Sequence, residues 1–181
     1  MFGIDYKGIV IKIIKGDITE QNTDAVVNAA NKRLSPGGGV AGAIHSAAGP
    51  GLWAECKKIE RCETGEAVIT KGYKLPAKWV IHTVGPVWAS RNQDPKMLYA
   101  CYVNSLSIAD QNEIKSISFP AISTGAFGYP LEEGAEIAVQ AVSEMVPKLS
   151  SVQLIQFVLY DDKTYNIFEE KLKNLEDKEK I

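Results

Sequence analysis

The chain has 181 residues, the length of one globular domain, and its 45% of hydrophobic residues is enough for a core that needs no metal or disulfide. Its 20 basic and 22 acidic residues leave a formal net charge of −2, which argues against broad electrostatic binding to nucleic acid or to an anionic membrane. No run approaches the roughly 20 apolar residues of a membrane-spanning helix, and the N-terminus lacks the features of a signal peptide.

Strands and helices are predicted in alternation along nearly the whole chain. Short β-branched runs indicate strands, and apolar residues three or four apart indicate helices. Pro95 fits the start of a helix, and Asp162 fits the cap of the last one. In chain order, we predict a strand over residues 9–14, a strand or short helix over 25–30, helices over 40–48 and 52–62, strands over 66–70 and 79–84, a helix over 95–108, a strand over 116–120, a helix over 131–149, a strand over 152–160 and a helix over 162–175.

This alternation predicts an α/β fold in which helices cover both faces of a largely parallel sheet. We expect a single domain over residues 1–181, because no internal repeat and no linker rich in Pro, Gly or Ser divides the chain. The charged residues from 169 to 181 are expected to form a solvated helix end.

The cysteines are odd in number, namely Cys56, Cys62 and Cys101. Reduced thiols in an intracellular, cytoplasmic protein are the simple interpretation. His45 and His82 do not stand at zinc-type spacing with them, so the sequence predicts no metal site.

Three polar, glycine-rich segments follow predicted strands, over residues 16–19, 28–42 and 123–129. In open α/β sheets, ligands bind beyond the carboxyl ends of the strands. These three segments are therefore the candidate binding loops.

The segment Gly37 to Gly42 fits the pattern G-x-G-x-x-G, in which backbone N–H groups approach a phosphate at the start of a helix. A loop of about eight residues separates it from the preceding strand, whereas a dinucleotide-binding motif follows its strand at once. A phosphate-binding loop of another kind is therefore favoured over a nicotinamide-dependent dehydrogenase. A flexible loop without a ligand is the remaining alternative.

The segment from Pro120 to Pro130 lies between a predicted strand and a predicted helix. Its small residues allow a tight turn whose N–H groups converge on an anion. Phe127 and Tyr129 in this loop fit either a lid over a sugar or base, or packing anchors. Two such loops in one small domain suggest a diphosphate held from two sides.

Three polar side chains stand close to these loops. The Asp17 carboxylate accepts hydrogen bonds, as recognition of an adenine amino group requires, or it caps a turn. Asn28 and Asn31 suit sugar hydroxyls, or they cap the backbone of a turn.

Five motifs together resemble the macro domain family in order and spacing, over roughly residues 8–175. They are Gly16-Asp17-Ile18-Thr19, Val27-Asn28-Ala29-Ala30-Asn31, the run from Gly37 to Ile44, the run from Val80 to Pro86, and the run from Ile122 to Pro130. The resemblance implies a three-layer α/β/α sandwich that binds ADP-ribose without a cofactor.

The resemblance also implies a role for individual residues of this chain. Asp17 would recognise the adenine amino group with Ile18 beside it, and Tyr160 would stack on the adenine. Asn31 would bond the distal ribose, the one not attached to adenine. The reaction would involve Asn31, Gly39 and Phe127. The full set of residues implied to contact ADP-ribose is Asp17, Ile18, Asn28, Asn31, Gly38, Gly39, Val40, Ser123, Thr124, Gly125, Ala126, Phe127 and Tyr160.

The chain departs from part of the family at Ala41, where the better-studied hydrolases carry an aspartate that is thought to help activate water. Without that carboxylate, we expect a phosphate of the substrate to orient the attacking water, while Asn31 and the Phe127 loop position the distal ribose. His45, one helical turn later, fits a packing histidine better than a proton carrier.

Family resemblance implies an ADP-ribosyl hydrolase that removes mono-ADP-ribose from acidic side chains, deacetylates O-acetyl-ADP-ribose or hydrolyses ADP-ribose 1″-phosphate. The alternative is a reader module that binds ADP-ribose without turnover, which Ala41 favours. We expect a monomer whose partners are ADP-ribose and mono-ADP-ribosylated proteins. Neither a membrane nor nucleic acid is expected as a partner, because no basic stripe with interleaved aromatics is present.

Overall fold

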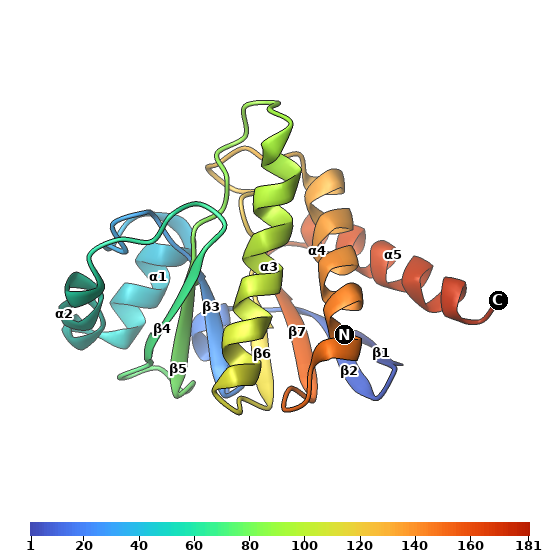
Figure 1. The fold of residues 1–181 in the computed structure, drawn as a ribbon, viewed down its shortest axis with the longest axis horizontal. Coiled ribbons are helices and arrows are strands. Elements are labelled where there is room, and N and C mark those ends of the chain that lie inside the picture. The colour runs from blue at the N-terminus through green and yellow to red at the C-terminus, as the bar shows by residue number, and fades with distance from the viewer.

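Seven strands form one sheet in the computed structural model, which describes all residues from 1 to 181 (Figure 1). The strands are β1 (Phe2–Tyr6), β2 (Ile9–Lys15), β3 (Ala25–Ala29), β4 (Ala67–Lys71), β5 (Trp79–Thr83), β6 (Ser116–Phe119) and β7 (Leu154–Leu159). Their order across the sheet is β1-β2-β7-β6-β3-β5-β4. The five inner strands run parallel, and β1 and β4 pair antiparallel at the two edges.

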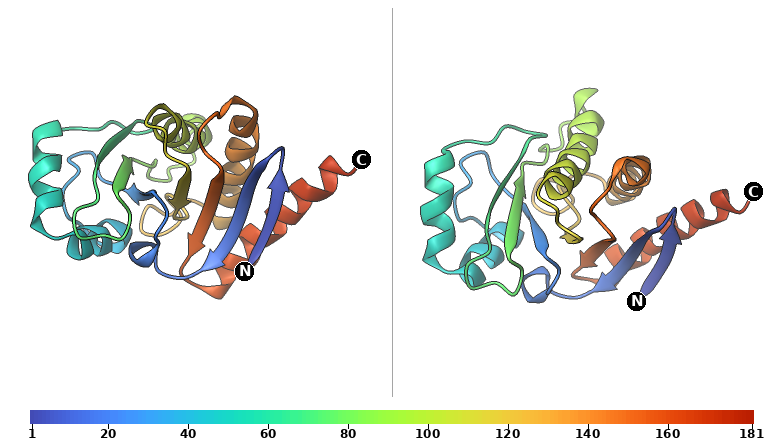
Figure 2. Two further views of the ribbon diagram at one scale, coloured as in Figure 1. Left: turned by 90° about the horizontal axis from the view of Figure 1, so that it is seen from below. Right: turned by 60° about the horizontal axis from the view of Figure 1, so that its bottom comes forward.

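Helices cover both faces of the sheet and complete three layers, as Figures 1 and 2 show. They are α1 (Gly39–Ala48), α2 (Pro50–Ile59), α3 (Gln93–Gln111), α4 (Leu131–Met145) and α5 (Asp162–Glu179), with short 3-10 helices η1 (Ile18–Glu20) and η2 (Val146–Lys148). One buried cluster lies between the sheet and α1 and α2, and a larger one lies between the sheet and α3, α4 and α5. None of these helices combines the length and the apolar character of a bilayer span.

The predicted α/β fold with a mixed, largely parallel sheet is confirmed, and the ambiguous run over residues 25–30 is strand β3. Both faces of β3 are buried because helices cover both sides of the sheet, with Val27 in one buried cluster and Val26 in the other, which explains its continuous apolar run. Three details of the prediction were wrong. Strand β1 was missed, α4 ends at Met145 rather than at residue 149, and Asp161 caps α5 in place of Asp162.

A row of buried aromatic rings connects α3, the two central strands and α5. The rings of Tyr102 and Phe119 lie 5.2 Å apart, and those of Phe157 and Phe168 also lie 5.2 Å apart. The Tyr102 hydroxyl accepts a hydrogen bond from the Ile122 N–H at 3.2 Å, and it donates to the Pro120 carbonyl at 3.4 Å. The core therefore holds the first residues of the segment that follows β6.

A fully buried histidine, His82 in β5, lies between the sheet and α1. Its Nδ1 is 3.1 Å from Asn28 Nδ2, and its Nε2 is 2.9 Å from Thr70 Oγ1. Burial, with a smaller contribution from nearby His45, lowers the pKa of His82 to about 3. The ring is therefore neutral at pH 7, with two hydrogen-bond partners in the sheet and a longer contact, 3.8 Å, from its Nε2 to Cys56 Sγ of α2.

We predict that the free energy of unfolding falls as the pH is lowered from 7 to 5. The unfolded chain binds a proton at His82 below about pH 6.5, whereas the folded chain does not bind it until about pH 3. The contribution of neutral His82 to the free energy of unfolding is thus complete above pH 6.5 and decreases as the pH falls below it. At pH 5 the loss is about 2 kcal/mol. Burial also lowers the pKa of His45, which adds a loss of the same sign.

Urea unfolding across this pH range measures the loss, and the variant His82→Gln is the control, since it should flatten the dependence. NMR titration of the His82 ring gives a second measurement. A ring that becomes protonated between pH 7 and 5 in the folded protein would contradict the prediction.

Candidate ligand-binding site

A cavity of about 460 Å³ lies at the carboxyl ends of β3, β6 and β7, three neighbouring parallel strands. This is the edge of the sheet at which α/β proteins bind ligands, and the volume suits a small molecule. Residues of four segments line it: Ala29, Ala30 and Asn31; Gly37 to Ala41; Pro120, Ala121 and Ser123 to Phe127; and Val158 to Asp161 with Thr164.

The first wall of the cavity is the glycine-rich segment that leads into α1. The N–H groups of Gly39, Val40 and Ala41 have no hydrogen-bond partner in the protein, and the N-cap residue Gly38 supplies no side chain to bond them. A Cβ on Gly42 would lie 2.3 Å from the Gly37 carbonyl oxygen, so the helix and the loop can approach this closely only with glycine there. The start of α1 thus offers free donors at the positive end of the helix dipole.

The second wall is the segment after β6. The N–H groups of Gly125, Ala126 and Phe127 have no hydrogen-bond partner within the protein. Ser123 has a positive φ of 65°, and its hydroxyl is buried at the cavity without a partner. Unpaired buried polar atoms are uncommon in proteins, so this hydroxyl indicates a place for a polar ligand.

Asn31 lines the cavity and also stabilises its own turn. Its Oδ1 accepts from the Ser35 N–H at 3.1 Å, and its Nδ2 donates to the Ser35 carbonyl at 2.9 Å. An amide nitrogen carries two hydrogens, so one N–H is left for a ligand. Both interpretations of Asn31, as a turn-capping residue and as a cavity residue, fit the structure.

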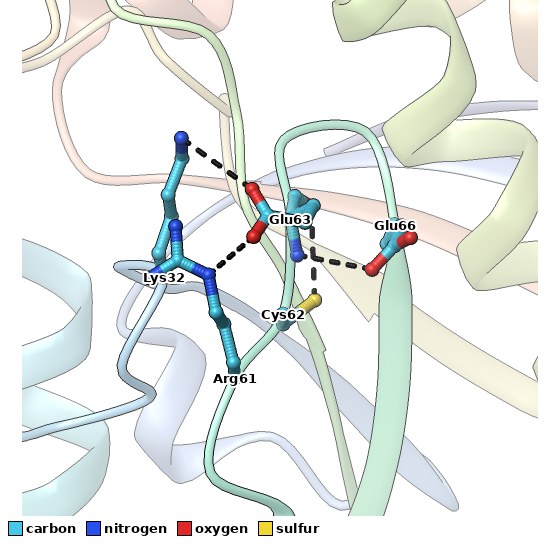
Figure 3. A network of polar contacts seen from close by, with 5 residues as sticks. All are labelled: Lys32, Arg61, Cys62, Glu63 and Glu66. Carbon is cyan, nitrogen blue, oxygen red and sulfur yellow. Dashed lines mark hydrogen bonds and ion pairs between the residues drawn. The ribbon is translucent and has the colours of Figure 1, made fainter.

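The segment after α2 contacts the turn that follows Asn31 and holds it in place. The Cys62 N–H donates to the Lys32 carbonyl at 2.9 Å. Glu63 pairs with both Lys32 and Arg61, and its N–H donates to Glu66, as Figure 3 shows. These bonds hold the Asn31 turn against the body of the domain.

Tyr160 lies at the rim of the cavity, immediately after β7. Its side chain is 85% exposed, which is unusual for a large aromatic residue and leaves its ring face free. Asp161 and Thr164 beside it also line the cavity, and the sequence did not single them out for binding. Their signal in the sequence is an aspartate three residues before a threonine at a helix start, but the cap of this helix was assigned to Asp162 instead.

Asp17 and Ile18 lie at the end of β2, next to β7, but they are not among the residues that line the cavity. The Gly16 N–H donates to the Leu159 carbonyl at 3.0 Å, which places Asp17 at the strand end beside Tyr160. Asp17 Oδ1 accepts from the N–H and the hydroxyl of Thr19 and caps η1. The turn-capping interpretation of Asp17 is therefore confirmed.

The structure does not bring Asn28 to the cavity, contrary to what the sequence led us to expect. Asn28 is still within β3 and pairs in register with His82 of β5. Its side chain points between the sheet and α1, where it is fully buried, and it contacts the His82 ring. Successive side chains of a strand point to opposite faces of the sheet. Asn28, inside the strand, therefore points to one face, whereas Asn31 lies beyond the strand end and can line the cavity.

The titratable side chains that line the cavity are Tyr160 and Asp161; no lysine, arginine or histidine does. The hydrogen bond from the Thr164 N–H lowers the pKa of Asp161, which is therefore ionised at pH 7. His45 lies outside the cavity and packs edge-on against Trp53, at 6.4 Å between ring centroids. Any anion in the cavity would thus be bound by backbone dipoles rather than by cationic side chains.

Fold and cavity together define an α/β domain with a cavity at the carboxyl edge of its sheet, lined on two sides by backbone N–H groups that have no partner in the protein. Sequence comparison agrees with this class: the family model described as "Macro domain" matches residues 27–138. A macro domain-containing protein of Chlorobaculum tepidum is 47% identical over 165 residues, covering 91% of this chain and 96% of its own. An O-acetyl-ADP-ribose deacetylase of Salmonella typhimurium is 48% identical, covering 87% and 91%.

The solved structures agree as well. A mutant of the Oceanobacillus iheyensis macrodomain with ADPR superposes with a TM-score of 0.94 at 40% identity, covering 97% of this chain and 98% of that chain. The chain belongs to the macro domain family. The resemblance seen in the sequence and the three-layer fold that it implied are both confirmed.

We predict that Gly42→Ala destabilises the protein although it lies in a helix. Helix propensity alone would favour alanine by roughly 1 kcal/mol. The added Cβ would instead meet the Gly37 carbonyl at 2.3 Å and force the two segments apart, at a cost of about 1–3 kcal/mol.

Gly38→Ala is the matched control, because nothing lies within 4 Å of its Cβ position. Thermal or urea unfolding of both variants makes the comparison. Equal stability of the two variants would show that the close approach is not a constraint.

Proposed function

We propose that this protein binds ADP-ribose in the cavity and hydrolyses its O-acetyl ester. The observation that carries the proposal is the pair of facing segments, Gly39 to Ala41 and Gly125 to Phe127, whose N–H donors have no partner in the protein. A diphosphate presents acceptor oxygens on two sides, and so it matches donors from two walls. The names of the relatives, which include deacetylases and a macrodomain with ADPR, support the same ligand.

The adenosine end of the ligand is proposed to lie toward β7 and β2. Tyr160 offers an open aromatic face for stacking on the base. Asp17, at the neighbouring strand end, has a carboxylate oxygen left over from its bonds to Thr19, and that oxygen could accept from the adenine amino group. Ile18 is proposed to contact the base from beside Asp17.

The distal ribose is proposed to lie between Asn31 and Phe127, with the Ser123, Thr124, Gly38 and Gly39 segments around the diphosphate. In the reaction, a water oxygen forms a bond to the acetyl carbonyl carbon, and the bond from that carbon to the ribose oxygen breaks. The ribose oxygen takes up a proton, and acetate and ADP-ribose leave. Asn31 and the Phe127 segment position the ester, and a substrate phosphate orients the water.

Removal of mono-ADP-ribose from acidic side chains is proposed as a second reaction of the same site, since it also hydrolyses an ester of the distal ribose. Mono-ADP-ribosylated proteins would then be the partners of a monomeric protein. Three free, buried cysteines support a reducing compartment such as the cytoplasm. A reader without turnover remains the second candidate, favoured by Ala41 in the wall of the cavity.

We predict that ADP-ribose binds with a measurable heat in titration calorimetry and that Tyr160→Ala weakens the binding by about 1–3 kcal/mol, the usual contribution of stacking on a base. Tyr160→Phe keeps the ring and should bind like the wild-type protein. Exposure of this side chain means that neither change should alter stability. Equal affinity of the alanine variant and the wild-type protein would refute stacking at this position.

We predict that the wild-type protein releases acetate from O-acetyl-ADP-ribose, and that Asn31→Ala lowers kcat by about 10-fold or more while ADP-ribose affinity falls less. The physical reason is that Asn31 holds the reacting ribose, whereas the two loops supply most of the binding. Acetate release followed by NMR measures this. Binding of ADP-ribose without any release by excess protein would establish the reader instead.

A further inference from the structure

The segment between β5 and α3, residues 85–92, has no role in the proposed site so far. It runs along the upper end of α3, where the segment before α4 also passes (Figure 1). That second segment carries the N–H donors of Gly125, Ala126 and Phe127. What holds these donors in place therefore matters for the site.

Trp88 makes the contact between the two segments. Its main-chain N–H donates to the Phe127 carbonyl at 2.8 Å, the one backbone hydrogen bond that joins residues 123–128 to a distant part of the chain, and its indole ring holds that N–H in place. Its ring lies 4.8 Å from the buried ring of Tyr129 at 58°, within the range of favourable aromatic pairs. The two contacts fix both the end of the donor loop and the residue just after it.

The segment that carries Trp88 is itself held at both ends. At its start, a Cβ on Gly85 would lie 2.1 Å from Ser123 Oγ, so the backbone of the segment is packed directly onto the second wall. At its end, the fully buried carboxylate of Asp94 accepts from the Ala89 N–H at 3.0 Å and the Arg91 N–H at 3.2 Å. Burial acts to raise the pKa of Asp94, but these bonds and the Arg91 side chain lower it overall, so the bonds are charge-assisted.

The donor loop has little else to hold it. Gly125, Ala126 and Gly128 are exposed and have no large side chain to pack, and the bonds within the loop are short-range. Such segments open at low cost unless another element braces them.

We propose that Trp88 is a positioning residue: it braces the Phe127 loop and so sets the geometry at the distal ribose end of the cavity. The proposal rests on the proposed function for its kinetic consequence, although its structural part does not. It differs from a general stabilising role because the brace should affect the distal end of the ligand and leave the adenine end unchanged.

The test compares Trp88→Ala and Trp88→Phe with Trp53→Ala. Trp53 is a partly exposed tryptophan of α2 on the opposite face of the sheet, and so it controls for the loss of an indole ring. We expect Trp88→Ala to lower kcat for O-acetyl-ADP-ribose by about 10-fold or more, because a small misplacement of a reacting group costs rate, and to raise KM as well, because the same loop carries donors for the diphosphate. AMP, which lacks the distal ribose, should bind as before, and Trp88→Phe should restore most of the rate.

Hydrogen exchange of the free protein gives a readout that needs no ligand. The hydrogen-bonded amides of Gly128, Tyr129 and residue 88 should exchange faster in Trp88→Ala, and at the wild-type rate in Trp53→Ala. Unchanged exchange and kcat in Trp88→Ala would overturn the proposal, as would an equal loss of AMP affinity, which indicates general damage.

Failure of the proposed function appears differently, as a wild-type protein that neither binds ADP-ribose nor releases acetate. In that case hydrogen exchange still tests whether Trp88 braces the Phe127 loop. If the wild-type protein binds without turnover, the ratio of ADP-ribose to AMP affinity replaces kcat, and a ratio unchanged by Trp88→Ala overturns the proposal.

Discussion

The site depends on one constraint: an anion in this cavity has to be bound by neutral donors, chiefly backbone N–H groups, because no lysine, arginine or histidine lines it. A backbone N–H lies on the main chain and cannot reach out as a side chain can, so the main chain itself must come close to the ligand. This requires small residues on both walls. Gly42 shows the cost of the arrangement, since its missing Cβ is what lets α1 touch the Gly37 carbonyl. A chain with a net charge of −2 can therefore hold a dianion without a basic patch.

Backbone donors work only if the loops that carry them are fixed, and the fold fixes them by hydrogen bonds from buried side chains. The Tyr102 hydroxyl holds Ile122 at the start of the second wall. Next to the cavity, at the end of β2, buried Gln156 donates to Gln21, which donates to the Asp17 carbonyl at 2.9 Å and so holds the segment proposed to contact the adenine. The parallel strands bring these segments to one edge, and the buried network beneath them sets their positions.

Much of this was predictable from the sequence, because glycines and strand ends carry signals that one sequence can show. The alternation of elements gave the α/β fold, and the glycine-rich segments after residues 28 and 122 gave both walls. Asn28 was misjudged because the apolar run over residues 25–30 is too short to distinguish a strand from a short helix, and only the observed strand shows that this side chain is buried on one face of the sheet. Contacts between distant segments, such as that of Trp88 with Phe127, leave no local pattern at all.

Ala41 determines what kind of catalysis the site can support. The wall at the start of α1 has no carboxylate, and the nearest ionised one in the lining, Asp161, lies beside Tyr160 at the proposed adenine end. A general base near the distal ribose is therefore missing among the lining side chains. Rate enhancement in the proposed reaction would then come from placing ester, water and phosphate in the reacting geometry, which can supply a large part of a barrier without proton transfer by the protein. On this argument the rigidity of the Phe127 loop counts for more here than in relatives with an aspartate at this position, because positioning is the contribution left to the protein.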